Sequence, residues 1–344
     1  MEAKDWAKSE GEGIDRRANK AHHTGDGRFQ NPHCPQIYRR LHHLLLWQLG
    51  FFNDLLPLEE PPEDFIYPNP PILLEPGEPT VTFINHSSFL VTVGGITILT
   101  DPIWSKRCSP LPLIGPKRRH TPPFEIEELS HLDYVLISHN HYDHLDKRTV
   151  KEIAERFPYA NWCVPLGVAK WFYKQGIGRV IELDWWETFE PLQRGPNGPA
   201  VAIHAVPAQH YSGRTARDHN RTLWAGWVAQ VGDKHFYFAG DTGYNPVHFK
   251  EIGEQFGAMD LSLIPIGVYT PRRFMAPVHM NPEDAVEVHK DVNSQLSVGT
   301  HWRTFRLSSE GAFQPPYDLY KAMEREGLCH STFRVIQPGQ SIHW

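Results

Sequence analysis

The stretch with the clearest capacity for chemistry is ISHNHYDHLD, between Ile137 and Asp146. It contains four candidate metal ligands: His139, His141, Asp143 and His144. The apolar run Tyr134–Ile137 before it predicts a buried strand that ends in a histidine-rich loop. His139 and His141 alternate along extended backbone and can face one side, whereas Asp143 and His144 follow a turn and can face a second metal. This spacing favours a metal site over the alternative, a solvated histidine-rich loop.

Three further candidates follow later apolar runs, each at the point where a predicted strand ends. His210 follows Val201–Val206, Asp241 follows Phe236–Phe238, and His301 follows Ser297–Thr300. Asp241 stands between Gly240 and Gly243, and glycines let the backbone approach a metal closely. The predicted ligands of the first metal are His139, His141, His210 and Asp241. Those of the second are Asp143, His144, Asp241 and His301, so Asp241 is predicted to bridge both.

The elements that must position these residues begin at Thr80, where short β-type runs replace a polar sequence. The apolar patterns predict these strands: Val81–Ile84, Phe89–Val93, Ile96–Leu99, Trp162–Pro165, Val180–Leu183, Val201–Val206, Trp224–Val231, Phe236–Phe238, Leu261–Ile266 and Ser297–Thr300. Helices are predicted at Thr149–Phe157 and at Asn281–Lys290, the latter with Asn281 as cap and a proline in its first turn. His204 lies within a predicted strand and is interpreted as structural.

Composition limits the function classes. The chain has 344 residues, 40% hydrophobic and 22% charged, which is typical of a globular protein. A formal charge of -6 argues against a nucleic-acid partner. The four cysteines form no CxxC pair, which indicates reduced thiols. The first thirty or so residues lack the apolar core of a signal peptide, and no run predicts a transmembrane helix. These features predict a cytoplasmic protein.

The N-terminal quarter of the chain differs from the remainder in composition and in predicted structure. Residues 1–35 are polar and are expected to be flexible, residues 36–79 form a helical and extended strap, and residues 80–344 form the catalytic domain. Within the strap, Ile37–Leu56 has helical apolar spacing and predicts an amphipathic helix on a membrane surface. Its expected membrane-facing side chains are Leu45, Trp47 and Phe51. The alternative is a helix that packs against the domain.

A short cationic run, Lys117–His120, lies in a proline-rich stretch between the third predicted strand and the metal loop. It is suited to anionic lipid headgroups. The alternative is a solvated loop. Together with Ile37–Leu56, the run predicts peripheral membrane association.

Several motifs carry a resemblance to a known family. They are HNHYDHLD, VIELDWWE (Val180–Glu187), PAQH, FAGDTGY (Phe238–Tyr244), IPIGVYTPRRFM (Ile264–Met275), HMNPEDAV (His279–Val286) and HWRTF (His301–Phe305). The chain resembles the N-acylphosphatidylethanolamine-hydrolysing phospholipase D family, a branch of the metallo-β-lactamase superfamily, from about Leu74 onward. The resemblance implies a single catalytic domain of α/β class, folded as an αββα four-layer sandwich around a dinuclear metal site.

The resemblance also implies roles for individual residues. The ligand assignments above carry over unchanged, with two Zn²⁺ per chain. Asp101 is expected to support the metal histidines by accepting a ring N–H, although an Asp before a proline is also typical of a turn. Asp143 and His279 are the expected catalytic residues, and Tyr142 is expected to face the substrate. For His279 the alternative is a histidine that caps or packs its loop.

The function implied is hydrolysis of N-acylphosphatidylethanolamine to N-acylethanolamine and phosphatidic acid through a metal-bridging hydroxide. Two cations about 3.5–4 Å apart bring bound water near a pKa of about 7 and neutralise charge on phosphoryl oxygens. The expected partners are the phospholipid and the membrane surface, with a homodimer also compatible. A related bacterial branch acts on lactones or other phosphodiesters, so a soluble metallo-hydrolase is one alternative. A non-catalytic, metal-stabilised lipid-binding protein is the second.

Overall fold

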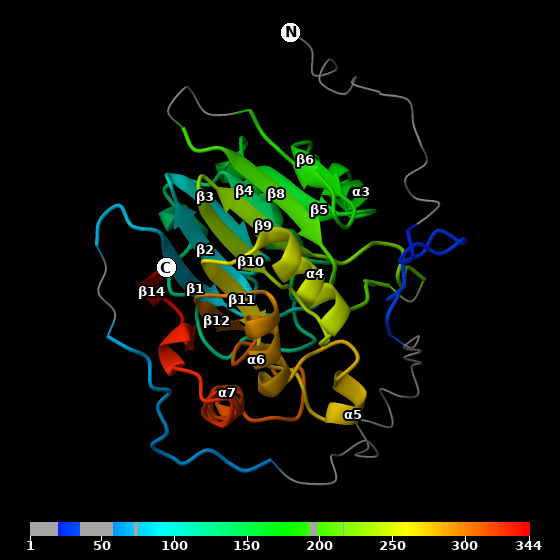
Figure 1. Ribbon diagram of the computed structural model, residues 1–344. Helices are drawn as coiled ribbons and strands as arrows, with labels where there is room; N and C mark the ends of the chain where they lie inside the picture. The colour runs from blue at the N-terminus through cyan, green and yellow to red at the C-terminus, as the bar shows by residue number, and fades with distance from the viewer. Residues whose placement is uncertain (1–19, 35–57, 72–74, 193–197, 216) are drawn as a thin grey trace.

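Two seven-stranded sheets face each other at the centre of the molecule (Figure 1). The computed structural model describes residues 20–34, 58–71, 75–192, 198–215 and 217–344. The first sheet has the strand order β14 (Ser341–His343), β1 (Thr80–Asn85), β2 (Ser88–Val93), β3 (Ile96–Thr100), β4 (Tyr134–Leu136), β5 (Asn161–Pro165) and β6 (Val180–Leu183). The second has the order β13 (Phe333–Arg334), β12 (Ser297–Thr300), β11 (Leu261–Pro265), β10 (Lys234–Phe238), β9 (Gly226–Val231), β8 (Val201–Val206) and β7 (Thr188–Phe189).

Both sheets are mixed, and this arrangement brings the ligand-bearing loops to one edge. Strands β1 to β3 are antiparallel neighbours, and β3 to β6 run parallel. Likewise β7 to β10 are antiparallel neighbours, and β10 to β13 run parallel. The carboxyl ends of β8, β10 and β12 therefore lie at the same edge of the second sheet. Those of β3 and β4 share an edge of the first.

Helices cover the outer faces of the sheets. On the first sheet, α2 (Lys147–Arg156) and α3 (Ala169–Tyr173) pack through buried residues such as Ile153 and Phe172. On the second lie α4 (Pro246–Phe256), α6 (Pro282–Asp291) and α7 (Gln314–Arg325), with the short α5 (Arg272–Met275) near the ligand-bearing edge. Two 3-10 turns complete the set, η1 (Ile126–Glu128) and η2 (His330–Thr332). The predicted αββα sandwich in a single domain is confirmed.

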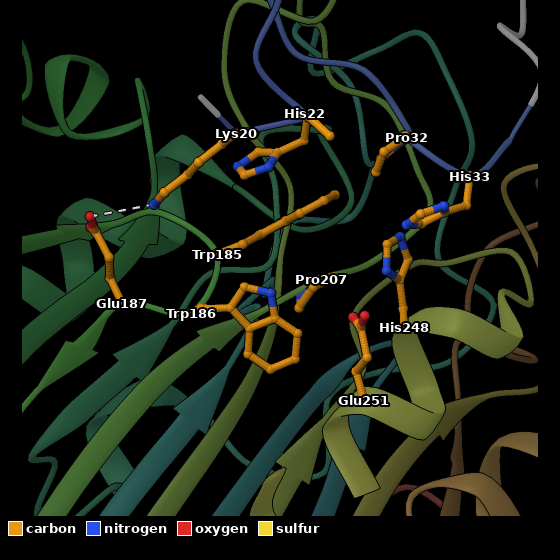
Figure 2. Close-up of a pocket in the computed structure, with 11 residues that line it drawn as sticks. Lys20, His22, Pro32, His33, Trp185, Trp186, Glu187, Pro207, His248 and Glu251 are labelled. Atoms are coloured by element: carbon orange, nitrogen blue, oxygen red, sulfur yellow. Dashed lines mark ion pairs between the residues drawn. The ribbon is translucent and has the colours of Figure 1, made fainter. Parts of the chain in front are cut away.

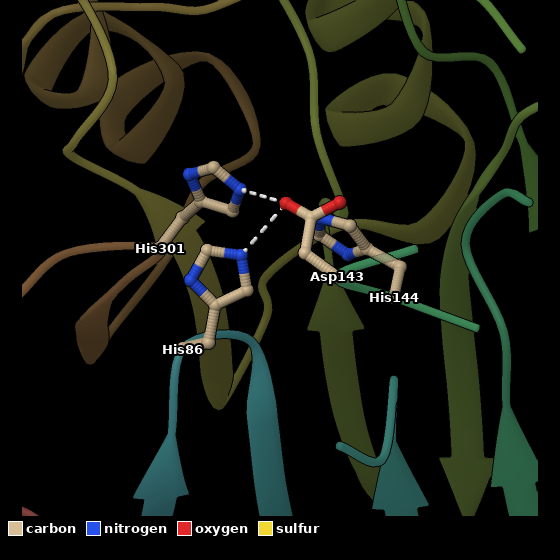
Figure 3. A group of neighbouring side chains, drawn as sticks. All are labelled: His86, Asp143, His144 and His301. Atoms are coloured by element: carbon tan, nitrogen blue, oxygen red, sulfur yellow. Dashed lines mark hydrogen bonds and ion pairs between the residues drawn. The ribbon is translucent and has the colours of Figure 1, made fainter. Parts of the chain in front are cut away.

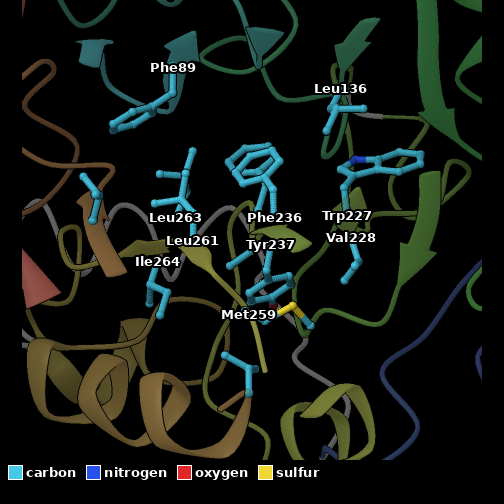
Figure 4. Packing of buried hydrophobic residues seen from close by; sticks show 14 of the residues in the cluster. Phe89, Leu136, Trp227, Val228, Phe236, Tyr237, Met259, Leu261, Leu263 and Ile264 are labelled. Carbon is cyan, nitrogen blue, oxygen red and sulfur yellow. The ribbon is translucent and has the colours of Figure 1, made fainter. Parts of the chain in front are cut away.

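The core between the sheets consists of large apolar side chains from both inner faces. Phe89 and Leu136 of the first sheet lie opposite Trp227, Phe236 and Leu263 of the second, all fully buried (Figure 4). Burial of each such side chain contributes about 1.5–3 kcal/mol. The Trp227 indole N–H also donates to the Ile137 carbonyl at 3.0 Å, so the core holds the start of the histidine-rich loop. This hydrogen bond ties the metal loop of one sheet to the other sheet.

The predicted strands and the helices predicted at Thr149–Phe157 and Asn281–Lys290 are present, with ends shifted by a few residues, whereas the helix predicted at Ile37–Leu56 lies outside the described residues. Helices α3, α4, α5 and α7 and strands β7, β13 and β14 were not predicted. Helix α7 begins QPPY, and its two prolines resemble a loop although proline is tolerated in a first helical turn. The short strands carry too few residues to show alternation.

The described N-terminal residues lie against the catalytic domain. In the range expected to be flexible, residues 20–34 are held by side-chain contacts, among them His22 to Asp184 at 2.7 Å and Asn31 to the His210 carbonyl at 2.8 Å. Residues 58–71 run along α7 and β13, where the Tyr317 hydroxyl donates to Glu59 at 2.6 Å. The predicted membrane-facing residues Leu45, Trp47 and Phe51 lie outside the described residues. None of the helices in the described part of the chain has the length and apolar character to span a bilayer.

Candidate metal centre

The seven predicted ligands come together at the common edge of the two sheets. They arrive on the loops after β4, β8, β10 and β12. Four of the histidines lie 3.1–3.9 Å from the Asp241 carboxylate, and His141 and Asp143 lie against those four. We call this group the Asp241 cluster: His139, His141, Asp143, His144, His210, Asp241 and His301. Residues separated by up to 162 positions in the sequence thus share one site.

The first half of the cluster contains three histidines, His139, His141 and His210, which form one candidate metal-binding group. His139 Nε2 lies 2.7 Å from His141 Nδ1, and His210 Nε2 lies 3.3 Å from the same atom. The other ring nitrogen of His210 lies 2.8 Å from the Val278 carbonyl oxygen. That nitrogen donates as N–H, so the Nε2 lone pair faces the cluster.

The second half contains Asp143, His144 and His301, shown in Figure 3. Asp143 Oδ2 lies 3.4 Å from His144 Nε2 and 3.5 Å from His301 Nε2. Both histidines are fully buried. This group matches the ligands predicted for the second metal.

Asp241 stands between the two halves. Its Oδ2 is 3.1 Å from His144 Nε2 and 3.2 Å from His301 Nε2 on one side, and 3.9 Å from His139 and 3.8 Å from His210 on the other. The backbone at Gly240, which has a φ of +63°, packs closely against Ser138. A Cβ at position 240 would lie 2.5 Å from the Ser138 Cβ, so glycine is required there. A carboxylate in this position is suited to bridge two cations.

Asp101, at the end of β3, supports the cluster from behind. Its Oδ2 accepts from His144 Nδ1 at 2.6 Å and from the Ser138 hydroxyl, while its Oδ1 accepts from the Ser138 backbone N–H at 2.7 Å. The Ser138 hydroxyl oxygen also lies 2.9 Å from His139 Nδ1. Asp101 thus orients His144 directly and His139 through Ser138, which is the geometry expected of a carboxylate that fixes a ligand tautomer.

His86 is a site residue that sequence analysis missed. It lies in the turn between β1 and β2, and its Nε2 is 3.0 Å from Asp143 Oδ2 (Figure 3). Its backbone carbonyl accepts from His301 N at 2.9 Å. A histidine in a two-strand turn carries no sequence signal for this role. Its backbone φ of +49°, with +29° at Asp101 and +60° at His301, is unusual for such residues and is typical of functional sites.

His279 lies beside the ligands at the end of the loop before α6. Its Nδ1 is 3.9 Å from Asp241 Oδ2, and its ring lies 5.1 Å from that of His210 and 5.4 Å from that of His301. Arg272 holds the loop by donating to the His279 carbonyl at 2.9 Å. The imidazole is therefore within reach of a group bound at the Asp241 cluster.

Tyr142 lies on the same loop as the first ligands but is engaged elsewhere. Its hydroxyl donates to the Arg214 carbonyl at 3.0 Å, and the Arg214 guanidinium lies 3.9 Å from its ring centroid. The side chain is half-buried. Its described contacts are with Arg214 and not with the Asp241 cluster.

The Asp241 cluster contains two buried carboxylates, and their negative charge is balanced only through shared protons or bound cations. Burial lowers the pKa of His139 and His210 well below the ordinary range. Burial acts in the same direction on His301, but the charges of Asp241 and Asp143 outweigh it and raise its pKa to about 9. Burial would raise the pKa of Asp241, yet His144 and His301 hold it well below the usual value. Two carboxylates thus draw positive charge into a buried site.

Unsatisfied buried atoms indicate what supplies that charge. Oδ1 of Asp241 and Nε2 of His144 and of His301 are buried, and none of them has a hydrogen-bond partner among the described residues. Such atoms cost free energy unless something binds them. Imidazole nitrogens and carboxylate oxygens in this arrangement are the donor set that zinc and similar divalent cations accept. The residues fit two such cations.

A second group of histidines and a carboxylate lies where residues 20–34 meet the domain. We call it the Asp184 cluster: Lys20, His22, His23 and Asp184. Both histidine Nε2 atoms and the Lys20 ammonium lie 2.7–2.8 Å from the Asp184 carboxylate, which also accepts the Trp185 N–H at 2.8 Å. A pocket of about 440 Å³ adjoins it, lined by Trp186, His248 and Glu251 among others (Figure 2).

Comparisons with known proteins identify relatives of this chain. Residues 97–302 match the model of the β-lactamase superfamily domain. The chain is 42% identical over 75% of its length to the N-acyl-phosphatidylethanolamine-hydrolyzing phospholipase D 1 of Caenorhabditis elegans, of which it covers 74%. It is 36% identical over 72% of its length to the mitochondrial N-acyl-phosphatidylethanolamine-hydrolyzing phospholipase D of Saccharomyces cerevisiae, of which it covers 52%.

A solved structure shows the same fold. The metallo hydrolase Igni18 from Ignicoccus hospitalis superposes with a TM-score of 0.56 at 23% identity, over 77% of this chain and 98% of that one. The family predicted from the motifs is confirmed. The chain belongs to the N-acyl-phosphatidylethanolamine-hydrolysing phospholipase D family of the β-lactamase superfamily.

Proposed function

We propose that this protein is a zinc-dependent phosphodiesterase of the phospholipase D type, which hydrolyses N-acylphosphatidylethanolamine to N-acylethanolamine and phosphatidic acid. The observation that carries the proposal is the convergence of two ligand groups on Asp241, with buried nitrogen and oxygen atoms that make no hydrogen bond among the described residues. The names of the C. elegans and yeast relatives supply the substrate class.

The residues of the chain have distinct tasks in this proposal. His139, His141 and His210 hold one divalent cation, and Asp143, His144 and His301 hold the other, with Asp241 shared. Two such cations supply an activated water and neutralise charge on phosphoryl oxygens. Asp101 keeps the lone pair of His144 directed at its cation by accepting the opposite ring N–H. His86 restrains Asp143 by donating its Nε2–H to Asp143 Oδ2.

His279 has a task at the substrate. The Asp241 cluster supplies ligands for both cations without it, and its ring lies beside them. From that position the imidazole donates a hydrogen bond to the phosphate or protonates the departing N-acylethanolamine oxygen. Asp284, in the first turn of α6, and Arg272 hold its loop through an ion pair and the Arg272 hydrogen bond to the His279 carbonyl.

The substrate class implies contact with a lipid surface. A diacyl phospholipid resides in a bilayer, so a peripheral membrane protein on the cytoplasmic face is the form of the enzyme that we propose. Residues 37–56 are one candidate for that contact on sequence grounds. A homodimer is compatible with the proposal and is measured by the mass of the purified protein in solution.

The test compares substrate classes with one purified protein. The full chain is incubated with an N-acylphosphatidylethanolamine in detergent micelles, a lactone, and a soluble phosphodiester. Release of N-acylethanolamine and phosphatidic acid, absent in Asp241→Asn, is the expected result. Faster turnover of the lactone or the soluble phosphodiester would assign the protein to a soluble metallo-hydrolase instead. Lipid binding without turnover of any substrate would indicate a non-catalytic protein.

A further inference from the structure

The chain between β3 and β4 forms a paired finger. Arg118 N donates to the Lys106 carbonyl at 2.8 Å, and Cys108 N donates to the Pro116 carbonyl at 3.3 Å. Arg107 and Lys117 form an antiparallel bridge between these bonds. We call residues 106–118 the finger and residues 109–115 its tip. The finger is held to the domain at Cys108, which packs with Ile103 and Phe305.

The tip exposes apolar side chains. Leu111, Leu113 and Ile114 are 52%, 84% and 66% exposed, and they lie within four residues of one another. Single exposed apolar residues are normal on a protein surface, but three on one short tip form a patch that favours burial. The tip therefore has the character of a contact surface.

The charge around the tip favours one kind of partner. The sequence from Ser105 to Phe124 contains no acidic residue, whereas Lys106, Lys117 and Arg119 are exposed. An apolar end above a cationic base matches a lipid monolayer, in which acyl chains lie beneath anionic headgroups. Within the cationic run Lys117–His120, the Arg118 side chain is turned inward and its Nη1 is buried. The outward charge is thus carried by Lys117 and Arg119.

The finger is attached directly to the wall of the metal centre. Arg119 N donates to the Thr304 carbonyl at 2.9 Å. The Thr304 hydroxyl accepts from His86 N at 2.7 Å, and His86 Nε2 lies 3.0 Å from Asp143 Oδ2. The base of the finger, where Arg119 follows it, therefore lies close to the Asp241 cluster.

We propose that the finger docks the protein on anionic phospholipid bilayers. Leu111, Leu113 and Ile114 enter the boundary between headgroups and acyl chains, and Lys106, Lys117 and Arg119 contact the headgroups. The docking rests on the proposed function for its purpose, because it places the metal centre against a membrane-resident substrate. It does not require residues 37–56.

The experiment measures binding of the full chain to vesicles of phosphatidylcholine with about 20 mol % phosphatidylserine. The double variant Leu113→Ser, Ile114→Ser is expected to lower the partition coefficient by roughly a hundredfold, about tenfold for each side chain. Lys117→Ser is expected to lower it about fivefold at low salt, and only on the anionic vesicles. The matched control is Tyr159→Ser, an 82% exposed residue before β5 and therefore at the opposite ends of the strands.

Each outcome bears on the docking. Equal binding by the folded double variant and the wild type overturns it, as does a wild type that does not bind vesicles. Loss of binding on changing Leu45, Trp47 and Phe51 to Ser, with the finger variant unaffected, overturns it in favour of residues 37–56. Should the double variant not fold, Leu113→Gln alone carries the same test. Finger-dependent binding without turnover of micellar N-acylphosphatidylethanolamine supports the docking and contradicts only the proposed function.

Discussion

The Asp241 cluster and the Asp184 cluster are built from the same residue types, yet their carboxylates are in opposite states. Asp184 is surrounded by donors: the Lys20 ammonium, two imidazoles and a backbone N–H all lie within 2.8 Å of its oxygens. Asp241 is surrounded by imidazole nitrogens at 3.1–3.9 Å, and its Oδ1 has no partner among the described residues. One carboxylate is satisfied by the protein, and the other is not.

The comparison teaches that hydrogen-bond satisfaction, more than residue type, separates a metal site from a structural anchor. A lysine beside a carboxylate already supplies the charge that a cation would bring, and the cation would have to displace it. The Asp184 cluster therefore acts as an anchor for residues 20–34. The Asp241 cluster keeps buried atoms without hydrogen-bond partners among the described residues, and bound cations would satisfy them.

Metal content gives the largest contrast between the two clusters. We expect two zinc ions per chain, both at the Asp241 cluster, and complete loss of activity after removal by a strong chelator, with recovery when zinc is restored. Elemental analysis of protein purified without added metal measures the number. Three ions per chain would place a metal at the Asp184 cluster and break the comparison. Activity retained with well below one ion would contradict the proposed centre.

Matched substitutions of the two carboxylates sharpen the contrast. Asp241→Asn should lower turnover by at least about 10³-fold, more than any single histidine change, because this carboxylate contacts both halves of the centre. Asp184→Asn should retain both metals and most of the activity. Metal content and turnover are measured on both variants. Similar losses in the two would show that the Asp184 cluster is part of the active site.

His279 tests whether a histidine beside the Asp241 cluster can lie outside the ligand set. His279→Ala should keep both metals and the fold but lower turnover by roughly 10²–10⁴-fold, as expected for loss of a general acid. Zinc content, thermal unfolding and turnover are measured together. A much smaller loss indicates that the residue packs its loop, and loss of zinc indicates that it is a ligand.

Sequence reasoning could find the Asp241 cluster because each ligand follows an apolar run that must be a buried strand. Parallel strands place their carboxyl ends together, so strand ends far apart in sequence could be expected to meet. His86 gave no such signal, because a turn histidine is as compatible with solvent as with a carboxylate. The Asp184 cluster was missed for another reason. Its partners are more than 160 positions apart, and residues 20–34 have no periodic pattern of their own.

The anchor role of the Asp184 cluster predicts a moderate loss of stability when it is broken. Asp184→Asn removes the charge that Lys20 and His22 face, and should cost about 1–3 kcal/mol in local stability of residues 20–34. Hydrogen exchange of those residues measures the effect, with the exchange of β10 and β11 as the internal reference. Unchanged protection in the folded variant would contradict the anchor.

Acid should loosen the same anchor by a smaller amount, and the direction follows from the pKa of His22. Burial lowers this pKa below the usual 6.5, outweighing the Asp184 contact. As pH falls through 6.5, the His22 imidazole is protonated more readily in the released segment than in the docked one. Acid therefore favours release of the segment. Asp184 adds no pH dependence in this range. Burial would raise its pKa, but hydrogen bonds from His22 and Lys20 hold it well below 3.8, and its contribution is lost only in stronger acid.

The measurement is the protection of residues 20–34 against hydrogen exchange between about pH 8 and about pH 5, corrected for intrinsic rates. Protection should fall toward the acid end in the wild type. His22→Gln keeps a side-chain donor for Asp184 but cannot titrate, so its protection should stay level over that range. Because both proteins carry the same Asp241 cluster, acid release of metal affects them equally and cancels in the comparison. A fall of equal size in the variant would show that His22 is not the group whose protonation loosens the anchor.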